Sequence, residues 1–251
     1  MDDDSFFARV PQAPHPTSEG PVDLPIHYRD ASLLGTFFAA DLDACRALVG
    51  PRSIEPWPLL GRAVVALYAW EYRDTTVGVY NEVGLGIQAR RRGSAPSLLR
   101  LARDMTADDD QGIWVVNLPV TTRAAFTAGV DLWGYPKYVT PIKSSFGRDG
   151  ARVRLGDELE LSVGQLHGPS LPGLPVVTYT EHEGRLLRTV IDVNHRARWG
   201  TGAGVRLDLL GDGPTASSLR ALGLAGKKPL ASFRTDTFRS RLPAGVDIGP
   251  A

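Results

Sequence analysis

Cysteine is almost absent from the sequence, which has only Cys45 among its 251 residues. A single cysteine excludes an intrachain disulfide and a zinc site built from several thiolates. Net charge is absent as well, because 28 basic residues balance 28 acidic ones. The chain therefore has no overall attraction to nucleic acid or to an anionic membrane surface, and we expect neither as a partner.

Long hydrophobic runs are also missing. No apolar stretch approaches the roughly 18 residues that a membrane-spanning helix requires. The sequence begins Met-Asp-Asp-Asp, which is the opposite of the basic start of a signal peptide. These features predict a soluble cytoplasmic protein.

Several cofactor motifs cannot be found in the sequence. The glycines at 84–86 and 200–204 lack the remaining glycine and the βαβ frame of a dinucleotide-binding site, and no phosphate-binding loop is present. The five histidines are scattered, and His182 between two glutamates is more typical of an exposed hairpin end than of a metal site. Asp108-Asp109-Asp110 is likewise typical of an exposed loop. We expect no metal and no organic cofactor.

Short apolar stretches at hairpin spacing predict many strands and few helices. We expect helices at 42–49, 123–130 and 214–224, and strands at 26–39, 62–72, 77–83, 112–120 and 205–210, with hairpins over 144–164 and 178–192. Residues 88–93 are polar and lead into a loop, and 231–238 is a strand or the start of a helix. This pattern predicts an α+β protein with a mainly antiparallel sheet that is curled or closed like a barrel. Residues 1–25, rich in proline, form an N-terminal arm suited to packing on a neighbouring subunit, and 26–251 form a single domain.

Lysine is scarce, and one lysine has an unusual setting. The chain has four lysines among its 28 basic residues, and Lys137 lies among Trp133, Tyr135, Pro136 and Tyr138. An ammonium surrounded by apolar groups loses hydration, which favours the neutral amine. A neutral lysine is a nucleophile that forms imines with carbonyl carbon. The alternative is a surface lysine whose stem lies along the aromatic rings.

Gly134-Tyr135-Pro136-Lys137 resembles the segment of the acetoacetate decarboxylase superfamily that carries the imine-forming lysine. Two further segments resemble the family in the same order, His27-Tyr28-Arg29-Asp30 and Tyr80-Asn81-Glu82-Val83-Gly84. The resemblance covers roughly residues 17 to 145. It implies a homo-oligomeric lyase acting on a small oxo acid, with Lys137, Glu82 and Arg29 as catalytic residues. The same resemblance leads us to expect the substrate to contact Arg29, Tyr80, Trp133, Tyr135 and Tyr138.

The sequence also departs from the family pattern. Decarboxylases of the family carry a second lysine directly after the first, where this chain has Tyr138, and a second carboxylate is not evident, Glu71 being the nearest candidate. Three functions therefore stay open. The first is decarboxylation of a 3-oxo acid through a lysine imine, and the second is an aldolase-dehydratase reaction with pyruvate as the imine partner. The third is ligand binding without turnover. Acid–base catalysis by Glu82 without the lysine is a further alternative.

Overall fold

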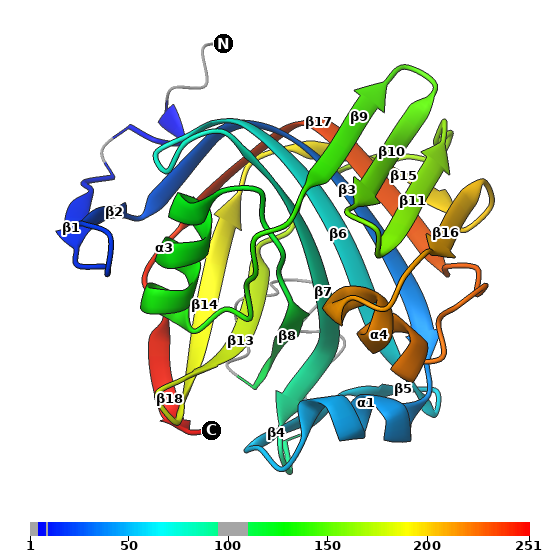
Figure 1. Cartoon of the computed structure of the whole chain (residues 1–251), viewed down its shortest axis with the longest axis horizontal. Coiled ribbons are helices and arrows are strands. Elements are labelled where there is room, and N and C mark those ends of the chain that lie inside the picture. The colour runs from blue at the N-terminus through cyan, green and yellow to red at the C-terminus, as the bar shows by residue number, and fades with distance from the viewer. Residues whose placement is uncertain (1–4, 9, 95–109) are drawn as a thin grey trace.

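A closed barrel of seven strands forms the centre of the structure, a computed structural model that describes residues 5–8, 10–94 and 110–251 (Figure 1). In pairing order the strands are β17 (Ala231–Leu242), β3 (Ile26–Ala40), β6 (Arg62–Thr75), β7 (Tyr80–Arg91), β8 (Gln111–Asn117), β13 (Val176–His182) and β14 (Arg185–Val193). Pairing of β14 with β17 closes the ring, and only β8 and β13 run parallel. The prediction of an α+β protein with a closed, mainly antiparallel sheet is confirmed.

A second sheet of four strands covers one side of the barrel, at the upper right of Figure 1. Its order is β16 (Val205–Leu209), β11 (Leu159–Gly164), β10 (Gly150–Leu155) and β9 (Ile142–Gly147). Buried residues alternate with exposed ones along β10 and with half-buried ones along β11, as expected for a sheet with one face on a core and one towards solvent. Leu155, Leu159 and Leu161 of this sheet join one hydrophobic cluster with Leu67 and Ile87 of the barrel.

Three helices occur within the described residues, and all three lie where the sequence predicts them. They are α1 (Leu42–Val49), α3 (Arg123–Trp133) and α4 (Pro214–Ala221). The shorter strands are β1 (Ala13–His15), β2 (Val22–Leu24), β4 (Ile54–Pro56), β5 (Pro58–Leu59), β12 (Ser170–Pro172), β15 (Arg196–Thr201) and β18 (Val246–Pro250). No helix in the described part of the chain is long and apolar enough to cross a membrane.

Several stretches differ from the sequence-based expectation, among them the short strands β1, β2, β4, β5, β12 and β15, which the sequence does not predict. Strand β7 continues through the polar residues 88–91, because Ala89 is buried and the charge of Arg90 is paired with Glu55 on β4 at 2.9 Å. Strand β18 was not predicted, since a five-residue strand with glycine and proline gives no periodic signal. Residues 231–238, left open between strand and helix, belong to β17. Asp108 and Asp109 lie outside the described residues.

Within the N-terminal arm, β1 and β2 pair as a two-stranded ribbon separate from the two larger sheets. The turn between them contacts α3 of the same chain. Glu19 forms an ion pair with Arg123 at 2.7 Å, and Asp131 accepts a hydrogen bond from the Ser18 amide at 2.7 Å. The described part of the arm therefore has contacts within its own subunit.

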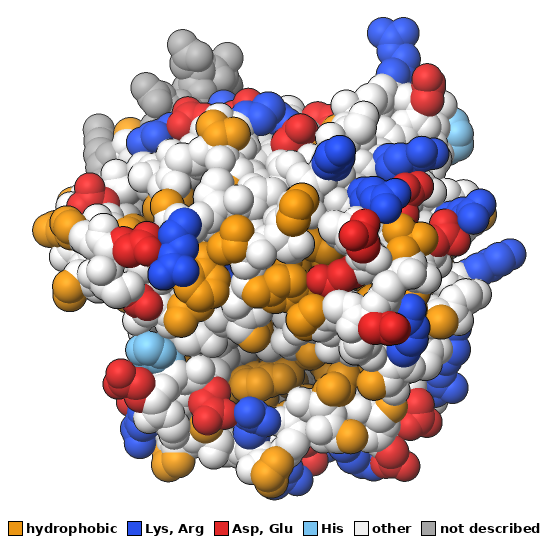
Figure 2. All heavy atoms as spheres, in the orientation of Figure 1, with side chains coloured by type: hydrophobic (Ala, Val, Ile, Leu, Met, Phe, Trp, Pro, Cys, Tyr) orange, Lys and Arg blue, Asp and Glu red, His pale blue; other side chains and the backbone are white. Residues whose placement is uncertain are grey.

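Charged side chains of both signs are interspersed on the face shown in Figure 2, and hydrophobic side chains gather in its hollowed middle. Beneath the surface, side chains along the barrel strands alternate between two environments. On β6, Ala63, Val65, Leu67 and Ala69 point outward into the core shared with the second sheet. The residues between them point into the barrel, and this alternation gives the barrel an interior of its own.

Candidate active site

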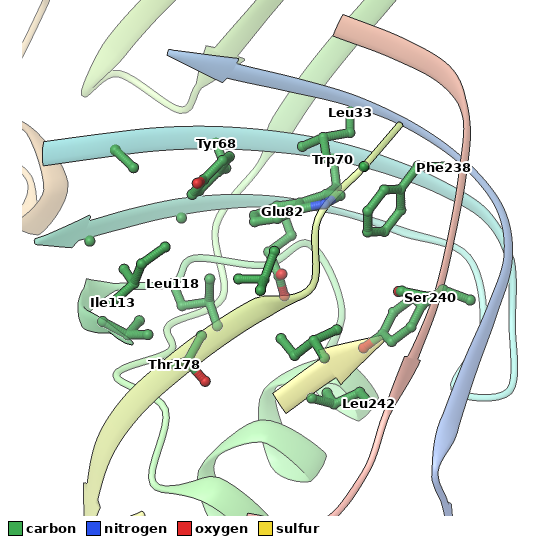
Figure 3. Close-up of a pocket in the computed structure, with 18 of the residues that line it drawn as sticks. Leu33, Tyr68, Trp70, Glu82, Ile113, Leu118, Thr178, Phe238, Ser240 and Leu242 are labelled. Carbon is green, nitrogen blue, oxygen red and sulfur yellow. The ribbon is translucent and has the colours of Figure 1, made fainter. Parts of the chain in front are cut away.

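The barrel encloses a cavity of about 460 Å³. Its wall on β6 and β7 consists of alternate residues, among them Tyr68, Trp70, Tyr72, Tyr80 and Glu82. Figure 3 shows Glu82 extending from β7 towards the middle of the cavity, with Tyr68 and Trp70 on the neighbouring strand and Thr178 across from them. Most of the lining is apolar or aromatic, so a carboxylate at this point is exceptional.

Helix α3 and its C-terminal glycine deliver the lysine segment to this cavity. The Thr122 side chain caps the helix by accepting a hydrogen bond from the Ala125 amide. The helix ends at Gly134 in the left-handed conformation (φ 64°). A β-carbon there would lie 2.2 Å from the Glu181 carbonyl oxygen, so both the backbone angle and the close approach require glycine.

One short segment, residues 118–120, joins the lysine and the glutamate. Its Leu118 amide donates to the carbonyl of Pro136 at 3.0 Å, and the Val120 amide donates to the carbonyl of Tyr138 at 2.9 Å. On its other side, the Pro119 carbonyl accepts a hydrogen bond from the Val83 amide at 3.0 Å. The backbones on either side of Lys137 and Glu82 are thus fixed to the same segment.

Lys137 Nζ donates a hydrogen bond to Glu82 Oε2 at 2.6 Å. The two side chains are only 6% and 8% exposed, so the ion pair is shielded from water. The rings of Tyr80 and Tyr135 each lie 5.9 Å from the nitrogen. A buried ion pair offsets its loss of hydration only through close contact, and removal of one partner costs about 3–5 kcal/mol. The arrangement sets an amine nucleophile beside a group that can accept and return its proton.

Four tyrosines surround this pair, and their hydroxyl groups are neutral. Burial raises the pKa of Tyr72 and Tyr80 well above the usual value, and the negative charge of Glu82 raises them further. Burial likewise raises the pKa of Tyr28 and Tyr135. The hydroxyls of Tyr28 and Tyr80 lie 3.1 Å apart, and that of Tyr135 lies 3.0 Å from Thr178 Oγ1. These groups can donate hydrogen bonds to a substrate oxygen but cannot act as bases near neutral pH.

The structure brings Lys137, Glu82, Tyr80, Trp133 and Tyr135 together around the cavity. Trp133 is fully buried, and its indole nitrogen donates to the Pro243 carbonyl at 3.0 Å, so the ring itself forms part of the wall.

Arg29 does not lie with them. Its neighbour Tyr28 occupies the inward position on β3, and consecutive side chains of a strand point to opposite faces. The Arg29 guanidinium is therefore exposed and lies 3.5 Å from Asp74 outside the barrel. The structure supplies no contact through which Arg29 would hold a substrate carboxylate in this cavity.

Tyr138 also lies away from the cavity. It follows Lys137 in an extended segment and points the opposite way, donating to Glu158 Oε1 at 2.7 Å. Its oxygen is 2.8 Å from Thr215 Oγ1 at the start of α4. The position at which the family has its second lysine thus serves packing in this chain. Glu71, the nearest candidate for a second carboxylate, pairs with Arg73 at 3.3 Å on the outer face of β6.

The sequence analysis did not identify three residues that line the cavity, two with a ring nitrogen and one glycine in contact with Lys137. Trp70 lies directly opposite Glu82 in the β6–β7 pairing, and its indole nitrogen is buried without a partner. His195 also lines the cavity, and burial lowers its pKa to about 4. Gly129 of α3 lies against the stem of Lys137. The alternation of aromatic residues at 68, 70 and 72 was the one available signal, since it predicts that all three share a face.

Comparison with known proteins agrees with this architecture. The sequence profile of the family described as acetoacetate decarboxylase (ADC) matches residues 9–163. The acetoacetate decarboxylase from Legionella pneumophila subsp. pneumophila str. Philadelphia 1 has a similar structure, with a TM-score of 0.68 and 18% identity over 99% of this chain and 95% of that one. An acetoacetate decarboxylase-like enzyme from Sphingomonas wittichii RW1 gives a TM-score of 0.62 and 15% identity over 96% and 100% of the two chains.

The enduracididine biosynthesis enzyme MppR, complexed with the condensation product of pyruvate and imidazole 4-carboxaldehyde, is similar as well. Its TM-score is 0.60, at 15% identity over 90% of this chain and 89% of that one. No curated protein sequence matches. Because the family profile covers more than half of the sequence, the chain belongs to the acetoacetate decarboxylase family, as its resemblance to that family predicts.

Proposed function

We propose that this protein is a lyase that acts on an oxo acid through an imine on Lys137. The observation that carries the proposal is the contact of 2.6 Å between Lys137 Nζ and Glu82 Oε2 inside a mostly apolar cavity. An amine attacks a carbonyl only after losing a proton, and a carboxylate within hydrogen-bond reach is the group to accept it.

The reaction begins when Lys137 Nζ attacks the ketone carbon. Glu82 moves protons between the nitrogen and the former carbonyl oxygen, so water leaves and a protonated imine remains. In a 3-oxo acid, the bond between the α-carbon and the carboxylate then breaks, CO₂ departs, and its electron pair neutralises the iminium as an enamine. A proton from Glu82 returns to the α-carbon, and water hydrolyses the imine to the product ketone and the free amine. Solvent supplies the proton that the overall reaction consumes.

Decarboxylation of a 3-oxo acid suits this cavity because the step removes charge. The substrate carboxylate and the iminium are charged before CO₂ leaves, and both the gas and the enamine are neutral afterwards. Neutral apolar walls stabilise the charged reactant less well than water does, and they stabilise the neutral products about equally. The cavity therefore lowers the barrier to loss of CO₂. Tyr138 and Arg29, which lie outside the cavity, do not touch the reacting atoms in this scheme.

An aldolase-dehydratase reaction is the second candidate. MppR, whose structure contains the condensation product of pyruvate and an aldehyde, shares the fold. The same imine can instead lose a proton from the carbon next to it, and the resulting enamine attacks an aldehyde. Glu82 would then accept the carbon-bound proton.

Trapping of the imine tests the proposal. The protein is incubated with acetoacetate or pyruvate, reduced with sodium borohydride, digested, and analysed by mass spectrometry. We expect a reduced adduct on Lys137, none on the exposed Lys143, and none in a Lys137→Ala variant. A Glu82→Gln variant should form the adduct more slowly, by on the order of 100-fold. Absence of an adduct with every oxo acid would overturn the proposal and leave a ligand-binding role without turnover.

A further inference from the structure

The cavity is much larger than a small oxo acid needs. Acetoacetate has seven non-hydrogen atoms. At about 30 Å³ for each water-sized group it occupies roughly 210 Å³, which is less than half of the cavity volume of 460 Å³. Volumes of this size belong to sites for drug-sized ligands. The lining also reaches far along one strand, since both Glu82 and Gln88 of β7 border the cavity. Six residues of a strand span roughly 20 Å.

The part of the cavity beyond the lysine is aromatic. Phe37, Tyr68, Trp199 and Phe233 come from four different strands and pack together there. Phe37 stacks on Trp199 with the ring centres 5.9 Å apart, and Trp199 lies 4.9 Å from Phe233. Tyr68 contacts both phenylalanines, at 6.0 and 6.2 Å. Such walls favour an aryl or alkyl group over a hydrated one.

The described residues that line the cavity include few charged side chains that could bind a charged substrate group. Among the described residues that line it, only Lys137 and Glu82 are charged at neutral pH, because His195 is neutral. No arginine borders it within that set. Leu171 and Leu174 line the cavity while being 45% and 56% exposed, so its entrance is apolar too. The binding energy for a substrate must therefore come largely from apolar contact.

Two polar groups among the described residues of the wall lack a hydrogen-bond partner, the indole nitrogen of Trp70 and Nδ1 of His195. The indole nitrogen of Trp70 is buried without a hydrogen bond, and Trp70 faces Glu82 across the β6–β7 pairing. Burying an unsatisfied donor is unfavourable, and an oxygen of a bound ligand would satisfy it once a small shift of the indole ring brings the nitrogen to the cavity surface. Figure 3 shows Trp70 and Glu82 side by side on adjacent strands, so this oxygen belongs near the reacting carbon.

We infer that the substrate is a 3-oxo acid whose ketone carries an aryl or long alkyl group. The ketone carbon reacts with Lys137, the carboxylate accepts a hydrogen bond from the indole nitrogen of Trp70, and the apolar group extends along β7 towards Gln88. This inference rests on the proposed lysine chemistry and adds to it a substrate class and a recognition residue.

A homologous substrate series tests the inference. CO₂ release is measured with acetoacetate, 3-oxohexanoate, 3-oxooctanoate, 3-oxodecanoate and 3-oxo-5-phenylpentanoate. Each buried methylene is worth about a fourfold gain in affinity, so full burial of the six methylenes that 3-oxodecanoate adds to acetoacetate should raise kcat/KM by on the order of 1000-fold. A protein that prefers acetoacetate to every longer acid, while forming the Lys137 adduct, would overturn the inference and leave the proposed function standing. Absence of both turnover and adduct would overturn the proposed function itself.

Two variants locate the determinants. Ala66 lines the cavity opposite Gly86, two inward positions beyond Glu82, so Ala66→Leu shortens the space for the apolar group. We expect the ratio of kcat/KM for 3-oxodecanoate to that for acetoacetate to fall at least tenfold, and Val64→Leu serves as the second variant if Ala66→Leu does not fold. An unchanged ratio in a folded variant would contradict the placement.

Trp70→Phe keeps a ring but removes the donor, and should lower kcat/KM about tenfold for every acid without changing the length preference. Equal activity in Trp70→Phe would exclude the indole nitrogen from recognition.

Discussion

The side chain of Lys137 crosses helix α3 at Gly129, where a β-carbon would lie 2.2 Å from Lys137 Cε and 2.5 Å from Cδ. The absence of a side chain at this point lets the amine reach Glu82. Gly129 is within the helix, where alanine would ordinarily stabilise the protein by about 0.5–1 kcal/mol.

We therefore predict that Gly129→Ala separates folding from reactivity. The lysine stem is flexible and can move aside, so the variant should fold with a Tm within a few degrees of the wild type. A displacement of about 1 Å at a reacting atom can reduce the rate on the order of 100-fold. The rate of borohydride-trapped imine formation measures this effect. Gly147→Ala is the matched control, because a β-carbon at Gly147 meets no atom within 4 Å. Equal trapping rates in the two variants would contradict the prediction.

The contact with Gly129 illustrates what the sequence could and could not predict. The barrel class, the helix positions and the candidates Lys137 and Glu82 follow from periodicity and from the family resemblance, because these depend on local patterns. The orientation of Arg29 and Tyr138 depends on which face of an extended segment turns inward, and a short motif does not define that. The alternation at 68, 70 and 72 predicts that Trp70 shares a face with two tyrosines, but it does not say that this face lines a cavity opposite Glu82. His195 lies in the short connection between β14 and β15, which has no periodic signal. The homo-oligomer stays a prediction.

The ion pair itself predicts a distinctive pattern of stability. Lys137→Met leaves the buried Glu82 carboxylate without its partner, and we expect a loss of about 3–5 kcal/mol in the free energy of unfolding at pH 7. Glu82→Gln in the same background removes the unpaired charge, so the double variant should recover much of that loss. Urea unfolding at pH 7 measures all four proteins of the cycle. Additive losses in the double variant would show that the two groups do not interact.

His195 predicts a pH dependence of stability. Burial lowers its pKa to about 4 in the folded protein, whereas an unfolded histidine has a pKa of about 6.5. Between these values the unfolded chain binds a proton that the folded chain does not, so the free energy of unfolding falls as the pH drops from 6.5 to 4. With partial solvent access at this residue, the loss is about 2–3 kcal/mol. Urea titrations at intervals across this range should show a shallower slope for His195→Gln. The exposed His167→Gln is the control, and equal slopes in all three proteins would contradict the prediction.

Tyr138 should act through position alone. Tyr138→Phe removes hydrogen bonds to Glu158 and Thr215, which anchor the residue after Lys137 to α4. Glu158 keeps its contacts with the Thr215 and Ala216 amides, so we expect a loss of about 1–2 kcal/mol in stability. Small displacement of the lysine should lower kcat while KM stays within twofold. A rise in KM with an unchanged kcat would instead assign Tyr138 to substrate binding.

A variant of Arg29 distinguishes two roles for this residue. The family resemblance implies that Arg29 binds the substrate carboxylate, whereas the barrel geometry places it in an exposed ion pair with Asp74. The guanidinium is exposed, and its partner Asp74 is 3.5 Å away, an arrangement worth about 0–1 kcal/mol. Arg29→Gln should therefore change neither the stability measurably nor KM for acetoacetate, whereas loss of a guanidinium that binds a carboxylate raises KM at least tenfold. Steady-state kinetics of Arg29→Gln beside Trp70→Phe makes the comparison, because both variants address the same carboxylate. A large rise in KM for Arg29→Gln alone would place the carboxylate at β3 and not at the indole nitrogen of Trp70.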